Sequence, residues 1–261
     1  MRELSSFTVI GLGKVGKIFT HLFKESLGLK LEHIIDTEED GNFLDINIEK
    51  KIPIKIDSDL IIISTPDDSI TSIINLLNES VNIKQKAILL HFSGALYIKQ
   101  QNIISIHPMM SITDYKNDLA RLKNHYFTLQ SDNTKLIKLF TPIIKKITKN
   151  FIIINGEDKK YFHLSAVMIN NFSTALVKSS VEVIKNLDIK EDIALKILLP
   201  LFEDVFINLI NNQDIKSSLT GPIIRNDYKT IKKHQELLKN IALDDERLIY
   251  DVFLKYIVKN F

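Results

Sequence analysis

The chain has 261 residues, of which 45% are hydrophobic and 25% charged, a balance that is ordinary for a folded protein and argues against disorder and coiled coil. Its 34 basic and 32 acidic residues leave a formal charge of +2, so neither nucleic acid nor a membrane surface is expected as a partner. The lack of cysteine excludes disulfides and thiolate chemistry, and the seven histidines show no ligand spacing, so no metal site is expected.

Two further features of the sequence bear on where the protein works. The longest apolar runs, such as the one around Ile61–Ile63, fall far short of the roughly 18 residues that a membrane-spanning helix needs. Residues Met1–Leu4 leave no room for the apolar region of a secretory signal before the first predicted strand. We therefore expect a cytoplasmic protein.

A glycine motif follows the first apolar run, Phe7–Ile10, as Gly11-Leu12-Gly13-Lys14-Val15-Gly16. The order predicts a strand, a tight turn and a helix whose N-terminus holds the diphosphate of a dinucleotide. Gly11 takes the sharp turn, Gly13 lets the backbone approach the diphosphate, and Gly16 lets the helix lie close on the strand. The alternative is a glycine turn in an α/β protein that binds no nucleotide.

A second strand is predicted at Leu31–Ile35 and leads to Asp36, twenty residues past the last glycine of the motif. The Asp36 carboxylate could accept hydrogen bonds from an adenosine ribose. It would also repel a 2′-phosphate, which favours NADH over NADPH. A solvated loop carboxylate is the alternative for this residue.

Further strands are predicted at residues 52–56, 59–63, 87–92, 102–106, 126–129 and 151–154, with helices at 69–81 and 134–148. The second of these helices carries Pro142, which predicts a kink or a break. The apolar block before Ser64-Thr65-Pro66 is typical of a parallel strand that is covered on both faces. Ligands of open α/β sheets bind at the carboxyl ends of such strands, so we assign Ser64, Thr65 and Pro66 to the cofactor site.

The second half of the chain changes to a helical period, with helices predicted at 158–187, 193–210, 227–239 and 244–259. The first is apolar or small on nearly all sides from Leu164 to Val177, which predicts burial in a helical domain or against a second subunit, and hence a homodimer. The predicted class is therefore α/β. A Rossmann-type, mostly parallel sheet forms a dinucleotide-binding domain over residues 1–155, and an all-α domain for substrate binding and dimerisation follows over 156–261.

Polar residues at two further strand ends are candidates for binding a small substrate. Ser93 and Gly94 offer a hydroxyl and a backbone N–H to a carboxylate, although a turn that merely requires glycine is an equal alternative. His107 offers an imidazole whose ordinary pKa of about 6.5 suits proton transfer, and a structural histidine is its alternative.

The helical half supplies three more candidates, His163, Asn171 and Arg225. Asn171 lies among apolar residues, where an unpaired amide costs roughly 1–3 kcal/mol, so it either packs with partners or faces a cleft. Arg225 is one of only four arginines in a chain rich in lysine and could clamp a carboxylate with two hydrogen bonds. An ion pair with Asp227 or between domains is the alternative.

These features extend into motifs that cover nearly the whole chain: Gly11-x-Gly13-x-x-Gly16, Thr65-Pro66-Asp67-Asp68-Ser69-Ile70, His91-x-Ser93-Gly94-Ala95, Ser105-x-His107-Pro108, His163-Leu164-Ser165-Ala166-Val167 through Asn171-Phe172, and Leu219-Thr220-Gly221-Pro222-Ile223-Ile224-Arg225-x-Asp227. With them the chain resembles the Rossmann-like proteins that carry a conserved helical C-terminal domain, relatives of pyrroline-5-carboxylate reductase and 6-phosphogluconate dehydrogenase. In length and organisation it is similar to an alternative form of ketopantoate reductase.

The resemblance implies reduction of a small 2-oxo acid, 2-dehydropantoate (ketopantoate), to pantoate by NADPH or NADH, on the way to pantothenate and coenzyme A. Many relatives carry an arginine after the second strand that reads the 2′-phosphate, where this chain has Asp36-Thr37. The activity of the family therefore favours NADPH, whereas the residue favours NADH. Two alternatives stay open: a reductase of another small oxo or imino acid, such as pyrroline-5-carboxylate, and a non-catalytic redox sensor that only binds the dinucleotide.

The same resemblance implies roles for the polar candidates. The usual ketopantoate reductases use a lysine with an asparagine on the first helix of the second domain, where this chain aligns His163 with Asn171. The proton donor therefore stays open among these two residues and His107, with Lys159 and Lys160 as further candidates. Holding the substrate carboxylate is assigned to Ser93, Gly94 and Arg225.

Overall fold

The computed structural model describes residues 4–212 and 214–261, which divide into two compact units between Val167 and Met168. The first unit contains the sheet and helices up to α5 (Lys159–Val167), and the second contains the remaining helices. The predicted domain boundary, between residues 155 and 156, precedes α5 instead of following it.

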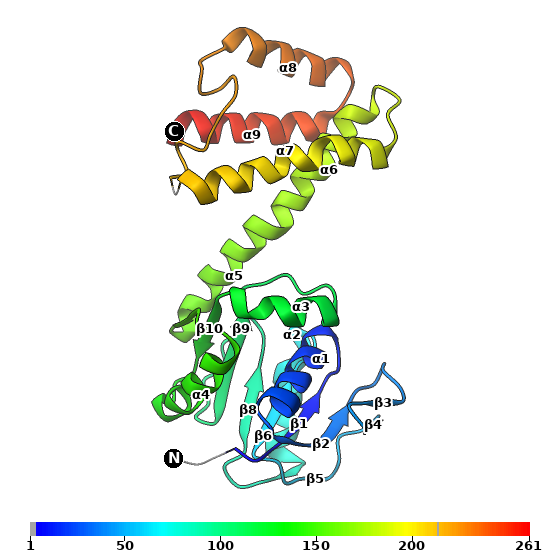
Figure 1. The fold of residues 1–261 in the computed structure, drawn as a ribbon, viewed down its shortest axis with the longest axis vertical. Coiled ribbons are helices and arrows are strands. Elements are labelled where there is room, and N and C mark those ends of the chain that lie inside the picture. The colour runs from blue at the N-terminus through cyan, green and yellow to red at the C-terminus, as the bar shows by residue number, and fades with distance from the viewer. Residues whose placement is uncertain (1–3, 213) are drawn as a thin grey trace. The chain divides into compact units, whose positions relative to one another are not determined.

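A nine-stranded, mostly parallel sheet forms the centre of the first unit, in the order β11-β10-β9-β8-β6-β1-β2-β4-β3 (Figure 1). Among the described strands of this sheet, only the pairs β9 with β10 and β3 with β4 are antiparallel. Its strands are β1 (Ser6–Ile10), β2 (Lys30–Ile35), β3 (Asn42–Phe43), β4 (Ile46–Glu49), β6 (Leu60–Ile63), β8 (Ile88–His91), β9 (Ile103–Pro108), β10 (Phe127–Gln130) and β11 (Phe151–Ile153). The predicted Rossmann-type fold class is confirmed.

The edge of this sheet beyond β2 differs from the prediction. The strand expected at residues 52–56 exists only as β5 (Lys55–Ile56), which pairs with β7 (Asn82–Ile83) in a separate two-stranded sheet. The polar stretch after Asp36 forms the hairpin β3–β4 instead, whose turn places Leu44 and Asp45 at φ of 51° and 64°. Left-handed residues match the twist of a two-residue hairpin. With two and four residues, β3 and β4 are too short for their apolar and polar pattern to stand out in a polar stretch.

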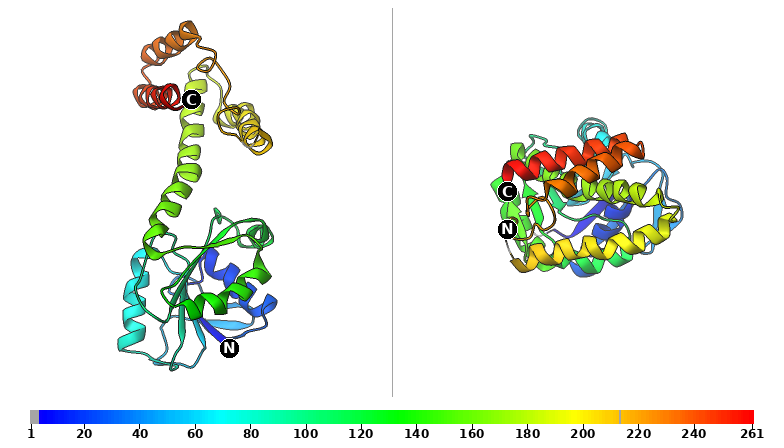
Figure 2. Two further views of the ribbon diagram at one scale, coloured as in Figure 1. Left: turned by 90° about the vertical axis from the view of Figure 1, so that its left-hand side faces the viewer. Right: turned by 90° about the horizontal axis from the view of Figure 1, so that it is seen from above.

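Side chains of the central strands alternate between two apolar cores, one on each face of the sheet. Leu60 and Ile62 belong to one core, while Ile61 and Ile63 belong to the other. Helices α1 (Lys14–His21), α3 (Tyr115–Arg121) and α4 (Thr134–Ile147) lie on the first face, and α2 (Asp67–Glu79) lies on the second (Figure 2). Because both faces are covered, the strands can be continuously apolar, as their sequences are.

Helix α4 continues through Pro142 to Ile147, so the predicted break does not occur. Proline removes one hydrogen bond of the helix, but the apolar face of α4, with Leu136, Phe140 and Ile144, is buried in the core on either side of Pro142. Packing therefore holds the helix together across the weak point.

The second unit contains four α-helices among its described residues: α6 (Ser173–Lys185), α7 (Glu191–Asn212), α8 (Tyr228–Asn240) and α9 (Asp244–Asn260). Helix α6 packs on α7 and α9, and α8 packs on α9. A π-helical segment, Met168–Phe172, precedes α6, so the long helix predicted at 158–187 is present but interrupted in its hydrogen-bond pattern. None of the described helices combines the length and the apolar content that crossing a bilayer requires.

Within a single copy of the chain, part of this long helix is uncovered. Leu164 is 57% exposed, Met168 53% and Phe172 54%. Apolar residues on all sides of a helix indicate that something covers it, but they do not say whether the cover comes from the same chain. Cover by a second subunit stays a prediction.

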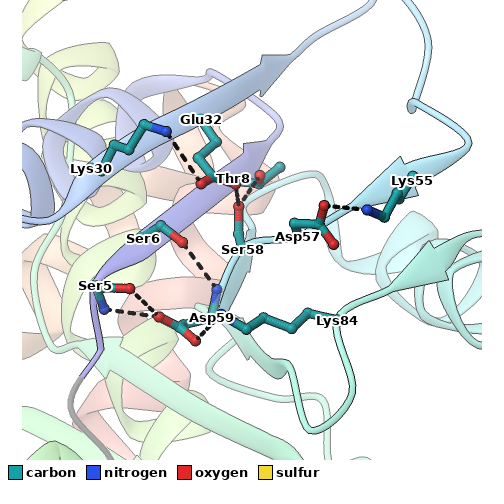
Figure 3. Close-up of polar contacts among 10 residues, drawn as sticks. All are labelled: Ser5, Ser6, Thr8, Lys30, Glu32, Lys55, Asp57, Ser58, Asp59 and Lys84. Atoms are coloured by element: carbon teal, nitrogen blue, oxygen red, sulfur yellow. Dashed lines mark hydrogen bonds and ion pairs between the residues drawn. The ribbon is translucent and has the colours of Figure 1, made fainter.

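Polar side chains tie the amino ends of β1 and β6 together (Figure 3). The Asp59 carboxylate accepts hydrogen bonds from the backbone N–H and the hydroxyl of Ser5 at 2.9 and 2.6 Å, and pairs with the Lys84 ammonium at 2.8 Å. Beside it, the fully buried hydroxyls of Thr8 and Ser58 lie 2.7 Å apart. Since Asp59 is only 4% exposed, its charge depends on these partners.

We expect Asp59→Ala to lower the free energy of unfolding by about 3 kcal/mol, because it leaves buried donors and a lysine without their carboxylate. Asp57→Ala is the matched control, since the Asp57–Lys55 pair has both side chains 61% exposed and should contribute less than about 0.5 kcal/mol. Urea unfolding of both variants measures the difference. Equal losses would show that the network does not stabilise the strand ends.

Candidate functional site

The turn between β1 and α1 has the geometry that its glycines predict. Gly11 lies at φ of +92°, and a Cβ there would lie 2.8 Å from the Ser64 backbone carbon. A Cβ on Gly16 would overlap the Gly11 carbonyl oxygen. Gly13 differs, because no protein atom lies within 4 Å of the position of its Cβ. Packing of the chain itself therefore requires Gly11 and Gly16, whereas the space at Gly13 is open to a ligand.

The N-terminus of α1 lies at this open space and has properties that favour an anion. Gly13 caps the helix without a side-chain hydrogen bond, and the first turn carries no acidic residue. The first N–H groups of an α-helix have no partner within the helix, and the helix dipole places partial positive charge there. Lys14 and Val15, the first residues of the turn, therefore present backbone donors to a negatively charged group.

A pocket of about 500 Å³ lies next to this turn, a size within the usual range for small-molecule sites. It is bounded by the glycine turn, the loop after β2 and the loop after β6. Its lining residues include Gly11, Gly13, Asp36, Thr37, Glu38, Glu39, Lys50, Ser64, Thr65 and Pro66. The structure thus brings most of the predicted cofactor residues around one cavity, and the Thr65 hydroxyl is buried there without a hydrogen-bond partner among the described residues.

Asp36 lines this pocket as an ionised carboxylate. Burial tends to raise its pKa, but hydrogen bonds from the backbone N–H groups of Leu12, Glu39 and Glu38, together with the charge of Lys50, lower the pKa overall. The Leu12 N–H lies 2.6 Å from the carboxylate, which joins the end of β2 to the glycine turn.

A second group of polar residues gathers at the carboxyl ends of β8 and β9, around the buried Lys159. This lysine is 1% exposed, and its ammonium donates to the Ser105 hydroxyl at 2.6 Å. Burial lowers the pKa of Lys159 to about 7, against a smaller opposing effect of the Asp67 charge. A lysine in this state gains and loses a proton near neutral pH.

A close approach of the chain sets this position of Lys159. Three residues before it, Gly156 packs directly on the ring of Tyr97, where any Cβ would overlap the ring. The glycine lets the turn Gly156–Asp158 lie against the sheet, so that α5 begins with its first side chain pointing to β9.

His107 lies on β9 two residues after Ser105, with one nitrogen engaged. Its Nδ1–H donates to the Phe92 carbonyl at 2.9 Å, because a carbonyl can only accept. Burial lowers the pKa of His107, the hydrogen bond to Phe92 opposes this, the charges of Lys159 and His163 lower the pKa further, and that of Asp67 raises it. The rings of His107 and His163 lie 6.4 Å apart and meet edge to face.

In the turn after β8, the Ser93 hydroxyl forms hydrogen bonds to other groups of the chain. Ser93 donates to the Asp67 carboxylate at 2.5 Å and accepts from the N–H groups of Ala95 and Leu96 at 3.2 and 2.9 Å. This hydroxyl, which sequence analysis assigned to a substrate carboxylate, thus already has three partners. Gly94 next to it lies against His107, and a Cβ there would be 2.7 Å from His107 Nε2.

Sequence analysis gave no role to His91, although the residue stands in one of the motifs. Its ring is 1% exposed, and neither nitrogen has a hydrogen-bond partner among the described residues. Burial lowers its pKa to about 3, helped by the charges of Lys159 and His107, so the ring is neutral. The sequence signal for His91 was a polar residue directly after the apolar run 87–90. Its pairing with Ser105 on the next strand is seen only in the structure.

The two remaining predicted residues, Asn171 and Arg225, lie in the second unit. Asn171 is exposed on the π-helical segment and accepts from the side chain of Asn170 at 3.1 Å. Arg225 is exposed before α8, and its charge helps Thr230 to lower the pKa of Asp227. Their assigned roles stay predictions.

We expect the burial of the Lys159 ammonium to lower the free energy of unfolding. Because its pKa falls from 10.5 to about 7 on folding, the unfolded chain binds more protons between these pH values, and stability rises with pH there. We expect Lys159→Met to raise the free energy of unfolding by about 2 kcal/mol at pH 7. This advantage should shrink toward pH 9.5, as urea unfolding at both pH values would show. A variant less stable than the parent at pH 7 would contradict the assignment of a buried, destabilised ammonium.

Comparisons with known proteins agree with this architecture. No curated protein sequence matches the chain. Among solved structures, a protein from Thermotoga maritima is 22% identical with a TM-score of 0.71, covering 97% of this chain and 96% of that one. A Bacteroides fragilis protein provisionally named an NADP oxidoreductase is 18% identical with a TM-score of 0.77, covering 98% of both chains. Pyrroline carboxylate reductase from Plasmodium falciparum, with NADP bound, is 13% identical with a TM-score of 0.55, covering 99% of both chains.

These structural similarities show a shared fold over nearly the whole length of the chain. A family model described as a domain of unknown function, DUF2520, matches residues 125–257, just over half of the sequence. The match runs from β10 through most of α9. The chain therefore belongs to the DUF2520 family.

Proposed function

We propose that the protein is an NAD(P)H-dependent reductase of a small oxo acid, with 2-dehydropantoate as the leading substrate and pantoate as the product, acting in the cytoplasm. The observation that carries the proposal is the buried Lys159, which holds an exchangeable proton at the carboxyl edge of a sheet whose first turn fits a diphosphate. The choice of 2-dehydropantoate rests on the resemblance of the sequence motifs.

The pocket beside the glycine turn fits a nicotinamide dinucleotide. The space at Gly13 and the N–H groups of Lys14 and Val15 would receive the diphosphate, and Asp36 would accept from the adenosine ribose. The names of the similar structures from Bacteroides fragilis and Plasmodium falciparum support this class of cofactor. When bound, the nicotinamide supplies the hydride.

Charge at the pocket favours NADH. The carboxylates of Asp36, Glu38 and Glu39 line the part of the pocket that follows β2 and would repel a 2′-phosphate. Lys50, the one cationic lining residue among those described, already donates to the carbonyls of Thr37 and Glu39 and pairs with Asp40.

Lys159 is the best placed proton donor in the first unit. Reduction of a ketone leaves an alkoxide, which needs a proton from a group that still carries one near neutral pH and can release it. The Lys159 ammonium meets this need, and Ser105 fixes its direction. His163 lies one helical turn further along α5 and His107 faces it, so both stay candidates for contacts with substrate, as does Asn171 in the second unit.

The second candidate function is reduction of a cyclic imino acid, supported by the structural similarity to pyrroline carboxylate reductase. Its nitrogen would also take a proton from Lys159. A panel that contains 2-dehydropantoate and pyrroline-5-carboxylate separates the two substrates, and a protein that binds the dinucleotide but turns over neither would be a redox sensor.

The activity is tested by the fall in absorbance at 340 nm when 2-dehydropantoate is added to protein and NADH. We expect Lys159→Met to lower kcat at least about 100-fold with little change in the Kd of NADH, and kcat of the parent to fall as pH rises above about 7, where the ammonium loses its proton. Lys160→Met is the matched control, since Lys160 is exposed, pairs with Glu157 and lies over the ring of Tyr161. A rate equal to the protein-free control with every substrate would end the proposal of catalysis.

The diphosphate site is tested by two glycine variants with opposite expectations. Gly13→Ala meets no protein atom and should keep its stability, but its methyl group should weaken NADH binding about tenfold or more. Gly28→Ala, at φ of +70° and outside the pocket, should lose about 1 kcal/mol of stability and bind NADH normally. Calorimetric titration and urea unfolding measure both quantities, and normal NADH affinity of Gly13→Ala would contradict the site.

We also propose a homodimer, since α7 and α9 each expose an apolar stripe at every fourth residue. The stripes are Ile193, Ile197, Leu201 and Val205 on α7, and Leu248, Val252 and Tyr256 on α9, all more than 40% exposed. Exposed apolar area of this extent marks an interaction surface. Light scattering at micromolar concentration should give twice the 30.0 kDa chain mass, and Leu201→Glu should lower it, whereas a monomeric parent protein would contradict the dimer.

A further inference from the structure

We propose that His107 recognises the carboxylate of the substrate through Nε2, and that binding of the carboxylate brings one proton into the site. The inference deepens the proposed reductase function and rests on it, because it names the group that selects an acid over a neutral carbonyl compound.

The hydrogen bond of His107 to the backbone leaves one nitrogen for a ligand. Nδ1–H is directed to the Phe92 carbonyl, so Nε2 is the atom that gains or loses a proton. In the described part of the chain no hydrogen-bond partner faces Nε2, and the residue that lies against it is Gly94. Any side chain at position 94 would cover this nitrogen. The glycine at position 94 therefore leaves this side of Nε2 free of a side chain.

A match of spacings brings the basic groups together. Ser105 and His107 are two residues apart on one face of β9, about 6.7 Å along a strand. Lys159 and His163 are four residues apart on one face of α5, about 6 Å along a helix. The two pairs therefore meet in register, Lys159 on Ser105 and His163 beside His107.

Lys159 supplies positive charge beside His107. Lys159 and His163 lie on α5 and His91 lies on β8, while Asp67 at the start of α2 is the acidic group that acts on His107. Because the His91 ring is neutral, the Lys159 ammonium is the cation that would attract an anionic ligand. The Asp67 carboxylate is hydrogen-bonded to Ser93. Without a ligand, burial keeps the pKa of His107 low and the ring neutral.

A carboxylate beside Nε2 changes this balance, because a negative charge raises the pKa of a neighbouring imidazole. His107 then takes one proton from solvent, Nδ1–H stays on the Phe92 carbonyl, and Nε2–H donates to the carboxylate. No covalent bond forms or breaks, and the proton of Lys159 stays available for the reacting oxygen. Affinity for the acid should therefore fall by up to about tenfold per pH unit above neutrality.

Oxamate and oxamide test the proposal with NADH present at saturation, because they differ only in a carboxylate and a carboxamide. Calorimetric titration at pH 7.5 in phosphate and in Tris measures proton uptake from the difference in binding enthalpy. We expect oxamate to bind at least tenfold more tightly than oxamide and to take up close to one proton, and Lys159→Met to keep this uptake.

Two variants isolate His107. His107→Gln should lose the proton uptake and the preference for oxamate, and Gly94→Ala should lose the preference by covering Nε2. His125→Gln is the control and should change neither, because His125 is a half-buried histidine outside this group whose Nδ1 is bonded to the Arg121 carbonyl. Folding of each variant is checked by its urea midpoint.

Equal affinity for oxamate and oxamide, absence of oxamate binding, or proton uptake in Lys159→Met that is not reduced by adding His107→Gln would overturn the proposal. Each of these results can occur while NADH still binds and 2-dehydropantoate is still reduced. Failure of the carboxylate site is thus distinguishable from failure of the reductase function.

Discussion

Cover of the parallel strands on both faces is the constraint on which the rest of the first unit depends. A strand packed between two apolar cores holds a polar side chain only where that side chain finds a partner, as Thr8 does in Ser58, because an unpaired buried polar group costs about as much as several apolar contacts contribute. Most polar residues of the sheet therefore lie near the ends of the strands. At the amino ends Asp59 and its partners form a network with short hydrogen bonds, while at the carboxyl ends Lys159 and three histidines gather.

The two ends of the sheet differ in how completely their polar groups are paired. Asp59 is surrounded by donors that suit its charge, so its burial stabilises the fold. At the other end, the hydroxyl of Thr65 and both nitrogens of His91 have no hydrogen-bond partner within the described chain, and Lys159 is desolvated. Groups held in this state are costly for stability, and such costs cluster at functional sites, where binding and proton transfer use them.

Two parts of the carboxyl edge, the pocket beside β2 and the ends of β8 and β9, differ in the charge of their side chains. The loop after β2 places carboxylates at one side of a pocket, and the N-terminus of α1, after β1, lies next to the same pocket. This combination suits a ligand with a diphosphate and ribose hydroxyls. Next to the ends of β8 and β9 lie Lys159 and His107, which suit a ligand that has a carboxylate and a second oxygen that accepts a proton. In the second unit, the exposed apolar stripes on α7 and α9 are the observation that supports the proposed homodimer.

The sequence by itself determined the sheet, the glycine turn and the helical second half, because each depends on local order: an apolar run before Gly11, a glycine at each close approach, and a 3.6-residue period after Gly156. Only the tertiary structure showed that β3 and β4 extend the sheet, since their half-buried pattern is as polar as a loop. It also singled out Lys159 and His91 from equally plausible polar residues. Desolvation comes from the strands, helices and turns packed around a side chain, and those neighbours are distant in the sequence.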